Sequence, residues 1–224
     1  MSRWLGLIVF VSAFFTLAFS QKQSYPDHWW APVEEEIPSW EITPDKAEKG
    51  KELILSKRNE LGVFSNFGAA GFILDGVGYA SVEGLWQMMK YPDPTDESDP
   101  RNQISGYPHS REQVKMMTGF EAKKAGDAAN KVNKNHGISW VSYQGEKFNY
   151  KDHGRGSQRH YEIIREGIRQ KVLQNPEVLK LLKSTGDLTL RPDHPIKDNS
   201  PPSYYYFDIL MELREEQKSS SKLL

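Results

Sequence analysis

The chain has 224 residues, a formal net charge of −1 and no cysteine. This near balance of charge excludes a global electric field that would draw the protein to nucleic acid or to an anionic lipid surface, so any contact with phosphate must be local. The lack of cysteine excludes disulfides and a lipid-modified cysteine anchor, and the length is typical of one domain that folds without crosslinks.

The first twenty residues have the pattern of a secretory signal peptide. Arg3 precedes an apolar run over residues 4–19, and the polar segment that follows starts at Gln21. The run is shorter than the about 20 apolar residues that a membrane-spanning helix needs, so an uncleaved anchor is the less favoured alternative. We therefore expect residues 1–20 to be cleaved and the protein to be exported, periplasmic or secreted, with no stable membrane span.

Residues 21–50 are rich in proline, tryptophan and acidic residues, which is typical of an extended arm rather than a packed element. If the arm were free in solution, Trp29, Trp30 and Trp40 would expose a large apolar area to water, which is unfavourable. We therefore expect the arm to lie across the domain or to meet a partner, and we favour the first.

Residues 51–216 are expected to form a single α+β domain that is mainly helical, with a small sheet or hairpins. Short apolar runs beside turn signals predict strands, and apolar residues at three- and four-residue steps predict helices. The serine-rich residues 217–224 are expected to be a disordered tail. Strands are predicted at residues 53–55, 72–74 and 139–143, and helices at 81–91, 110–117, 120–135, 158–174, 177–184 and 207–216.

The helix predicted after the N-cap Ser81 carries an acid and an amine on one face. Glu83 and Lys90 are seven residues apart, and a helix drifts by only about 20° per heptad. Lys90 leans back toward Glu83, Gln87 lies between them, and the adjacent Trp86 could supply a flat wall for a base or a ribose. An acid in the first turn and a lysine in the last turn also offset the helix dipole, and on spacing alone this structural account is the better one.

Two further motifs have equally ordinary explanations when each is taken alone. Asn66, in the block Phe-Ser-Asn-Phe at residues 64–67, is as often a turn residue bonded to backbone as a ligand contact. The sequence Thr-Gly-Asp at residues 185–187 is by itself a common helix C-terminus.

The order of these motifs resembles the NADAR family, whose name stands for NAD- and ADP-ribose-associated. Its opening has a Ser-Asn-Phe block, a short hairpin, and a helix with Glu, Gln and Lys at fixed spacing. The resemblance covers roughly residues 53–214. It is carried by residues 64–67, 72–76, 79, 81–83 and 87–90, and it continues at 122–126, 164–171, 175–176 and 181–187.

The resemblance weakens after residue 187. Many members carry an acid soon after the Thr-Gly-Asp turn and an Asp followed by Trp-Gly, whereas this chain has Arg-Pro-Asp-His at residues 191–194. Asp198, followed by Asn and Ser, would fill the place of the aspartate. This departure is typical of a divergent branch and leaves the choice of substrate open.

The resemblance implies an N-glycosidase of nucleotide ribosides or of ADP-ribose attached to guanine. Glu83 would stabilise the positive charge that builds up on the ribose carbon C1 as the bond to the base breaks. Lys90 would either form a Schiff base with the opened ribose or stay charged and bind a phosphate or hydroxyl. The other implied substrate contacts are Asn66, Phe67 and Gln87 on the sugar or base, Trp86 stacking, and Asp187 or Asp198 activating water.

The expected partner is a nucleotide or ADP-ribosyl molecule, including ADP-ribosylated nucleic acid, and no cofactor is expected. A metal hydrolase is disfavoured because the six histidines are scattered with no His-x-x-x-His pair. The main rival is a non-catalytic ADP-ribose- or nucleotide-binding module with the same pocket, which export favours slightly because NAD-derived substrates are mostly cytosolic. A third hypothesis is an interaction protein that acts through the tryptophan-rich arm.

Overall fold

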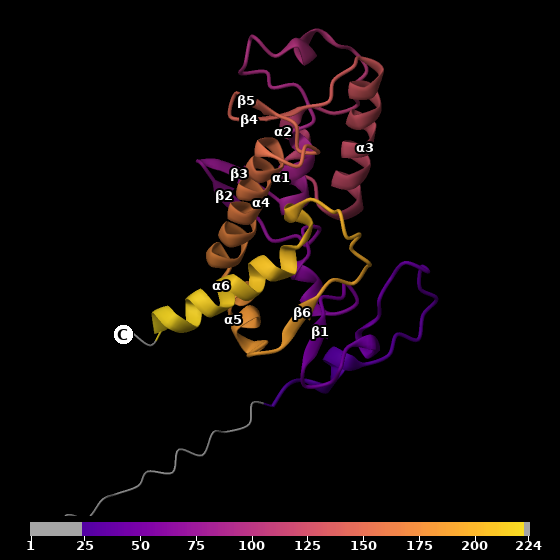
Figure 1. Ribbon diagram of the computed structural model, residues 1–224, viewed down its shortest axis with the longest axis vertical. Helices are drawn as coiled ribbons and strands as arrows, with labels where there is room; N and C mark the ends of the chain where they lie inside the picture. The colour runs from indigo at the N-terminus through magenta and orange to yellow at the C-terminus, as the bar shows by residue number, and fades with distance from the viewer. Residues whose placement is uncertain (1–23, 222–224) are drawn as a thin grey trace, which may run out of the picture.

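A computed structural model describes residues 24–221 of the chain, so the predicted signal peptide lies outside the described residues. Helices and short strands alternate along the chain (Figure 1). The helices are α1 (Val82–Met88), α2 (Arg111–Val114), α3 (Gly119–Asn135), α4 (Arg155–Gln174), α5 (Pro176–Ser184) and α6 (Tyr206–Ser221). The strands are β1 (Glu52–Ile54), β2 (Phe72–Leu74), β3 (Val77–Tyr79), β4 (Val141–Tyr143), β5 (Glu146–Phe148) and β6 (Thr189–Arg191). Short 3₁₀ helices are η1 (Asp27–Trp30), η2 (Pro44–Lys46), η3 (Glu60–Phe64), η4 (Pro100–Gln103) and η5 (Pro202–Tyr204).

The strands pair two by two in the described part of the chain. β2–β3 and β4–β5 are antiparallel hairpins, and their turns, Asp75-Gly76 and Gln144-Gly145, adopt the positive φ angles that tight hairpins need. β1 and β6 pair in parallel, which joins the start of the domain to the segment after α5. The α+β single domain expected from the sequence is confirmed.

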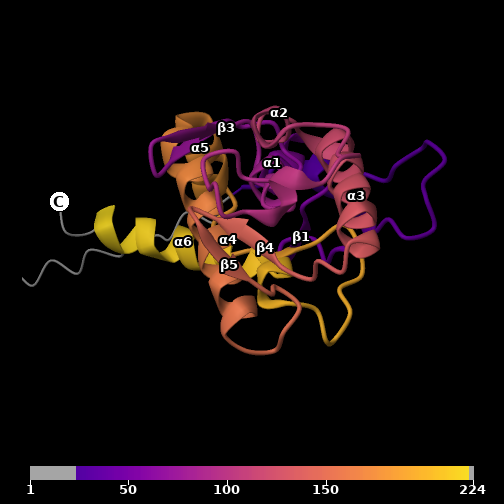
Figure 2. The ribbon, with the colours of Figure 1, turned by 90° about the horizontal axis from the view of Figure 1, so that it is seen from above.

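Helix α1 is surrounded by other elements. It packs against α2, α3 and α4, and Figure 2 shows it between α3 on one side and α4 and α5 on the other. All seven of its residues are buried. Its polar side chains therefore cannot point to bulk solvent, and they need partners or a cavity inside the fold.

The described part of the arm, drawn in indigo beside β1 in Figure 1, lies against the domain. Trp29 and Trp30 are buried, and both indole nitrogens donate hydrogen bonds, Trp29 to the Glu60 carboxylate at 2.6 Å and Trp30 to the Glu52 carbonyl at 2.8 Å. Trp40 remains 45% exposed. Over the described residues, no helix combines the length and the apolar character needed to cross a membrane.

The C-terminal helix is longer than predicted. α6 continues through Ser221, so residues 217–221, expected to belong to a disordered tail, are described as helix, and residues 222–224 lie outside the described part. Lys218 gives the physical reason, because its ammonium donates to the Gly186 carbonyl at 3.0 Å and to the Asp187 carboxylate at 2.5 Å. These bonds attach the last turns of α6 to the turn between α5 and β6.

A fully buried lysine holds the segment that follows η3. The Lys171 ammonium on α4 has no exposed surface and donates to the carbonyls of Val63 at 2.9 Å, Phe64 at 3.2 Å and Ser65 at 2.8 Å. Three acceptors match the three N–H bonds of an ammonium group. Lys171 thus fixes the backbone immediately before Asn66.

We expect Lys171→Met to lower the free energy of unfolding by about 2 kcal/mol, because one buried and two part-buried carbonyls lose their donor. The measurement is urea denaturation followed by circular dichroism. Lys180→Met is the matched control, since Lys180 is a lysine on α5 whose side chain is 79% exposed. An equal loss in the two variants would contradict the assigned role.

Candidate functional site

The N-terminus of α1 is fixed from both sides. The Ser81 hydroxyl donates to the Met117 carbonyl at 2.8 Å and accepts the N–H of Gly84 at 2.9 Å, which caps the helix as predicted. A Cβ on Gly84 would lie 2.7 Å from the Met117 carbonyl oxygen, so the close packing requires glycine. The Glu83 N–H donates to the Asn66 carbonyl at 2.9 Å. This bond links the Asn66 segment directly to the predicted catalytic acid.

The C-terminus of α1 is fixed by side chains from other elements. Three consecutive carbonyls accept hydrogen bonds: Met89 from Arg101 at 3.0 Å, Lys90 from Asn133 at 3.0 Å, and Tyr91 from Arg111 at 3.1 Å. Helix C-termini leave carbonyls unpaired and favour positive charge, and the two guanidinium groups meet both needs. The backbone that carries Lys90 is therefore held in one place.

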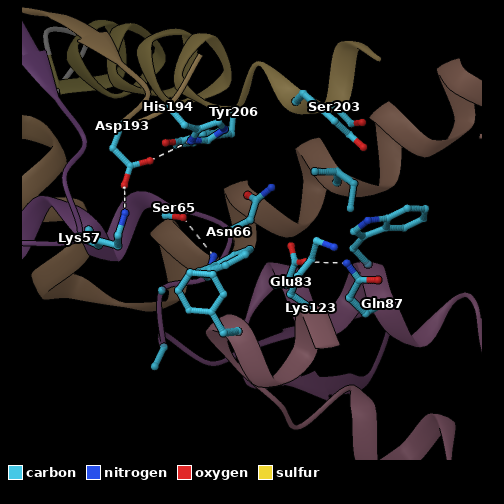
Figure 3. A pocket seen from close by; sticks show the side chains of 18 of the residues that line it. Lys57, Ser65, Asn66, Glu83, Gln87, Lys123, Asp193, His194, Ser203 and Tyr206 are labelled. Atoms are coloured by element: carbon cyan, nitrogen blue, oxygen red, sulfur yellow. Dashed lines mark hydrogen bonds and ion pairs between the residues drawn. The ribbon is translucent and has the colours of Figure 1, made fainter. Parts of the chain in front are cut away.

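The polar face of α1 lines a cavity of about 930 Å³. Glu83 is 5% exposed and Lys90 is 4% exposed. Figure 3 shows Glu83 and Gln87 together in the cavity wall, with Asn66 nearby. The structure brings six of the predicted site residues to this cavity: Asn66, Phe67, Glu83, Trp86, Gln87 and Lys90.

The Glu83 carboxylate is paired inside the wall. It accepts a hydrogen bond from the Gln87 amide at 2.6 Å. Burial raises the pKa of Glu83, whereas the Gln87 hydrogen bond and the charge of Lys90 pull this pKa downward. Gln87 fits here because Gly126 on α3 has no side chain, and a Cβ on Gly126 would lie 1.6 Å from the Gln87 Oε1.

The Lys90 ammonium is buried with no hydrogen-bond acceptor within reach among the residues that the structure describes. Its Nζ lies 4.6 Å from the centre of the Trp86 ring, a cation–π contact. Burial lowers the pKa of Lys90 to about 8, against the opposing effect of the Glu83 charge. With this pKa, about a tenth of the side chain is the neutral, nucleophilic amine at pH 7, far more than for an exposed lysine.

Trp86 lines the cavity but has little ring surface left for a base. Besides Lys90, the Tyr150 ring meets it edge-on with centroids 4.6 Å apart, and the His160 ring lies 4.0 Å away. The side chain is 8% exposed. The contacts of Trp86 are thus mainly with Lys90, Tyr150 and His160, and stacking on a substrate stays a prediction.

The two aspartates predicted to activate water do not line the cavity. The Asp187 side chain is 93% exposed and pairs with Lys218 at the turn after α5. Asp198 lies on an exposed loop after β6. The structure therefore does not bring either residue together with Glu83, because the pairing of Asp187 with α6 and the path of the loop at Asp198 are long-range features that local motifs do not encode.

Several residues of the cavity wall carried no signal in the sequence. His160 on α4 is 1% exposed, and its Nδ1 lies 3.0 Å from the Ser203 hydroxyl. Burial and the nearby charge of Lys90 lower the pKa of His160 to about 3, so its imidazole is neutral. A lone histidine in a helix is usually an ordinary core residue, which is why its position was not predictable. Other cavity residues of this kind are Lys57, Lys123, Tyr150, Asp193 and Tyr206.

No protein-family model and no curated protein matches the chain. Among solved structures, the chain is similar to the NMR structure of the E. coli protein YbiA, with 21% sequence identity and a TM-score of 0.45 over 75% of this chain and 84% of that chain. A likeness of this size carries no functional argument. Within the described residues, no group of three or more histidine or acidic side chains is placed to hold a metal ion.

We expect Gly126→Ala to raise the pKa of Glu83, because the new methyl group displaces Gln87 and removes a hydrogen bond to the carboxylate. Carbon-13 NMR titration of the glutamate carboxyl signals measures this pKa. The control is Gly78→Ala, where a Cβ meets no atom within 4 Å. A folded Gly126→Ala protein with an unchanged Glu83 pKa would refute the assigned hydrogen bond.

Proposed function

We propose that this protein is an N-glycosidase that hydrolyses the bond between ribose and a nucleobase or amine, in a nucleotide riboside or in ADP-ribosylated guanine. The observation that carries the proposal is the burial of one acid and one amine, Glu83 and Lys90, in the wall of the same cavity. The motif resemblance to the NADAR family indicates which reaction these two groups would catalyse, the cleavage of an N-glycosidic bond. Perturbed pKa values beside a cavity are typical of catalytic groups.

Buried polar atoms without hydrogen-bond partners support the proposal that the ligand is rich in hydroxyl groups. Among the described residues, five buried side-chain nitrogen or oxygen atoms have no hydrogen-bond partner. Four belong to side chains of this cavity wall, and the fifth is on Arg214. Such atoms cost free energy in the empty protein, and a sugar whose entry shifts the side chains slightly would satisfy them. The four are Asn66 Oδ1, Gln87 Oε1, His160 Nε2 and the Tyr206 hydroxyl.

Glu83 would act on the carbon that loses the base. When the bond from C1 to the base nitrogen breaks, its electron pair leaves with the base and positive charge develops on the ribose. A carboxylate fixed by Gln87 in a site with little water stabilises that charge without reorganising. In the overall reaction, the hydroxyl of a water molecule ends on C1 and a proton ends on the departing nitrogen.

Lys90 has two chemically distinct roles open to it. As a neutral amine it would attack C1 of the opened ribose; the bond from C1 to the base nitrogen would then break, the base would leave with a proton from the amine, and a Schiff base would remain. Water would hydrolyse this Schiff base, which releases the sugar as its aldehyde and restores the amine. As an ammonium it would bind a phosphate or hydroxyl. Its burial, its lowered pKa and its lack of an acceptor favour the first role.

We expect Glu83→Gln and Lys90→Ala each to lower the rate of base release at least about a hundredfold, because each removes a group that acts on C1. Purified protein is incubated with an ADP-ribosylated guanine oligonucleotide, NAD and nucleotide ribosides, and free base is measured by chromatography. Glu177→Gln and Lys180→Ala, both on the exposed face of α5, are the matched controls. Thermal melting checks that each variant folds.

The same assay separates the enzyme from a non-catalytic binding module. Ligands that raise the melting temperature of the wild-type protein, together with no release of base from any substrate, would establish the binding module and end the catalytic proposal. Turnover that survives in both Glu83→Gln and Lys90→Ala would place the chemistry elsewhere.

The pH profile distinguishes the two roles of Lys90. If the neutral amine is the nucleophile, kcat/KM rises about tenfold per pH unit and levels off above the Lys90 pKa of about 8, because deprotonation creates the reactive form. If the ammonium binds phosphate, kcat/KM instead falls as the pH rises through the same range. We expect the rising profile, and borohydride should trap a covalent adduct that Lys90→Ala lacks.

A further inference from the structure

Trp40 is a large aromatic side chain that the packing of the arm leaves uncovered. It is 45% exposed, although Trp29 and Trp30 in the same arm are buried. Trp40 also lines the cavity that contains Glu83 and Lys90. An exposed indole at the edge of a cavity is typical of a ligand contact, because covering it gains free energy.

The backbone on the C-terminal side of Trp40 is fixed. The Glu41 carboxylate accepts two hydrogen bonds from Arg58, at 2.8 and 2.9 Å, and the Ile42 N–H donates to the Asp193 carbonyl at 2.8 Å. Glu41 is itself buried. The exposure of Trp40 is therefore built into the fold, since the adjacent residues are paired with the domain.

Parallel pairing of β1 and β6 places charged groups beside Trp40. Lys57 follows β1 and Asp193 follows β6, and the carboxyl ends of parallel strands lie at one edge. The Lys57 Nζ is 2.9 Å from Asp193, 3.4 Å from Glu41 and 4.5 Å from the centre of the Trp40 ring. Lys57 and Arg58 together face the two carboxylates of Glu41 and Asp193, so the charges at this end of the cavity are paired and it suits a neutral ring better than a phosphate.

An unpaired hydroxyl lies at the same end. Tyr206 is 4% exposed, and its hydroxyl has no partner among the described residues. Figure 3 shows Tyr206 near His194 and Asp193, whereas Glu83 and Gln87 lie on the other side of Asn66. The ring nitrogens and exocyclic groups of a heteroaromatic base can pair with such a hydroxyl.

We propose that Trp40, Lys57, Asp193 and Tyr206 form a second subsite, which takes a neutral heteroaromatic ring such as a purine base. The substrate then has two parts, a ribose at Glu83 and Lys90 and a base held against the arm at the far end. The identity of the first part rests on the function proposed above. The arm thereby becomes part of the substrate site.

The test compares a two-part with a one-part ligand. Isothermal titration of the full chain measures the Kd of ADP-ribose, which carries a purine, and of ribose 5-phosphate, which does not. We expect Trp40→Ala to weaken ADP-ribose binding about tenfold, as stacking on an aromatic side chain predicts, and to leave ribose 5-phosphate unchanged. Trp40→Phe should keep most of the affinity. Ile37→Ala is the control, since Ile37 is 36% exposed on the same arm and does not line the cavity.

Each outcome bears on the subsite separately from catalysis. ADP-ribose binding that depends on Trp40 without any turnover would support the subsite and refute the glycosidase. Turnover by the wild-type protein with equal ADP-ribose affinity in Trp40→Ala would refute the subsite alone. A parallel loss of affinity for both ligands, or no ADP-ribose binding by the wild type at millimolar concentration, would also overturn it.

Discussion

The burial of α1 on every side is the constraint on which the rest of the structure depends. A helix of seven residues has little stability of its own, so its position comes from packing against α2, α3 and α4. That packing leaves Glu83, Gln87 and Lys90 at most 5% exposed. The cavity is therefore the place where these polar groups meet a solvent-like environment, and the site and the core are built by the same contacts.

Holding so short a helix requires that its ends be fixed as firmly as its faces. Ser81 and the Asn66 carbonyl fix the first turn, and Arg101, Asn133 and Arg111 fix the carbonyls at the other end. Arg101 is fully buried, and its charge is balanced by Asp99 at 2.7 Å. A buried ion pair contributes little net stability, so its role here is better understood as positioning. The ion pair holds in place the turn that carries Lys90.

Local rules predicted α1 well and the rest of the site poorly. The N-cap Ser81 and the hydrogen bond between Glu83 and Gln87, four residues apart, follow from helix geometry, which acts over a few residues, whereas Lys90 lies in the turn after α1 ends at Met88. The Lys57–Asp193 pair depends on β1 and β6, which are distant in the sequence and pair in parallel, and no local pattern specifies that pairing. The pairing of Asp187 was not predictable for the same reason, because its partner Lys218 belongs to a helix extension that composition did not suggest.

The same burial that weakens the fold prepares the site for chemistry. Removing an acid and an amine from water raises the pKa of Glu83 and lowers that of Lys90, so the free-energy gap between the charged pair and the neutral pair becomes smaller. A smaller gap lowers the free energy needed to change the protonation state of the pair during a reaction. An apolar pair at these positions would pack with less cost, and stability alone therefore does not explain why the core contains them. The proposed glycosidase would require such reactive groups, and Lys90, which makes no hydrogen bond among the described residues, fits that proposal.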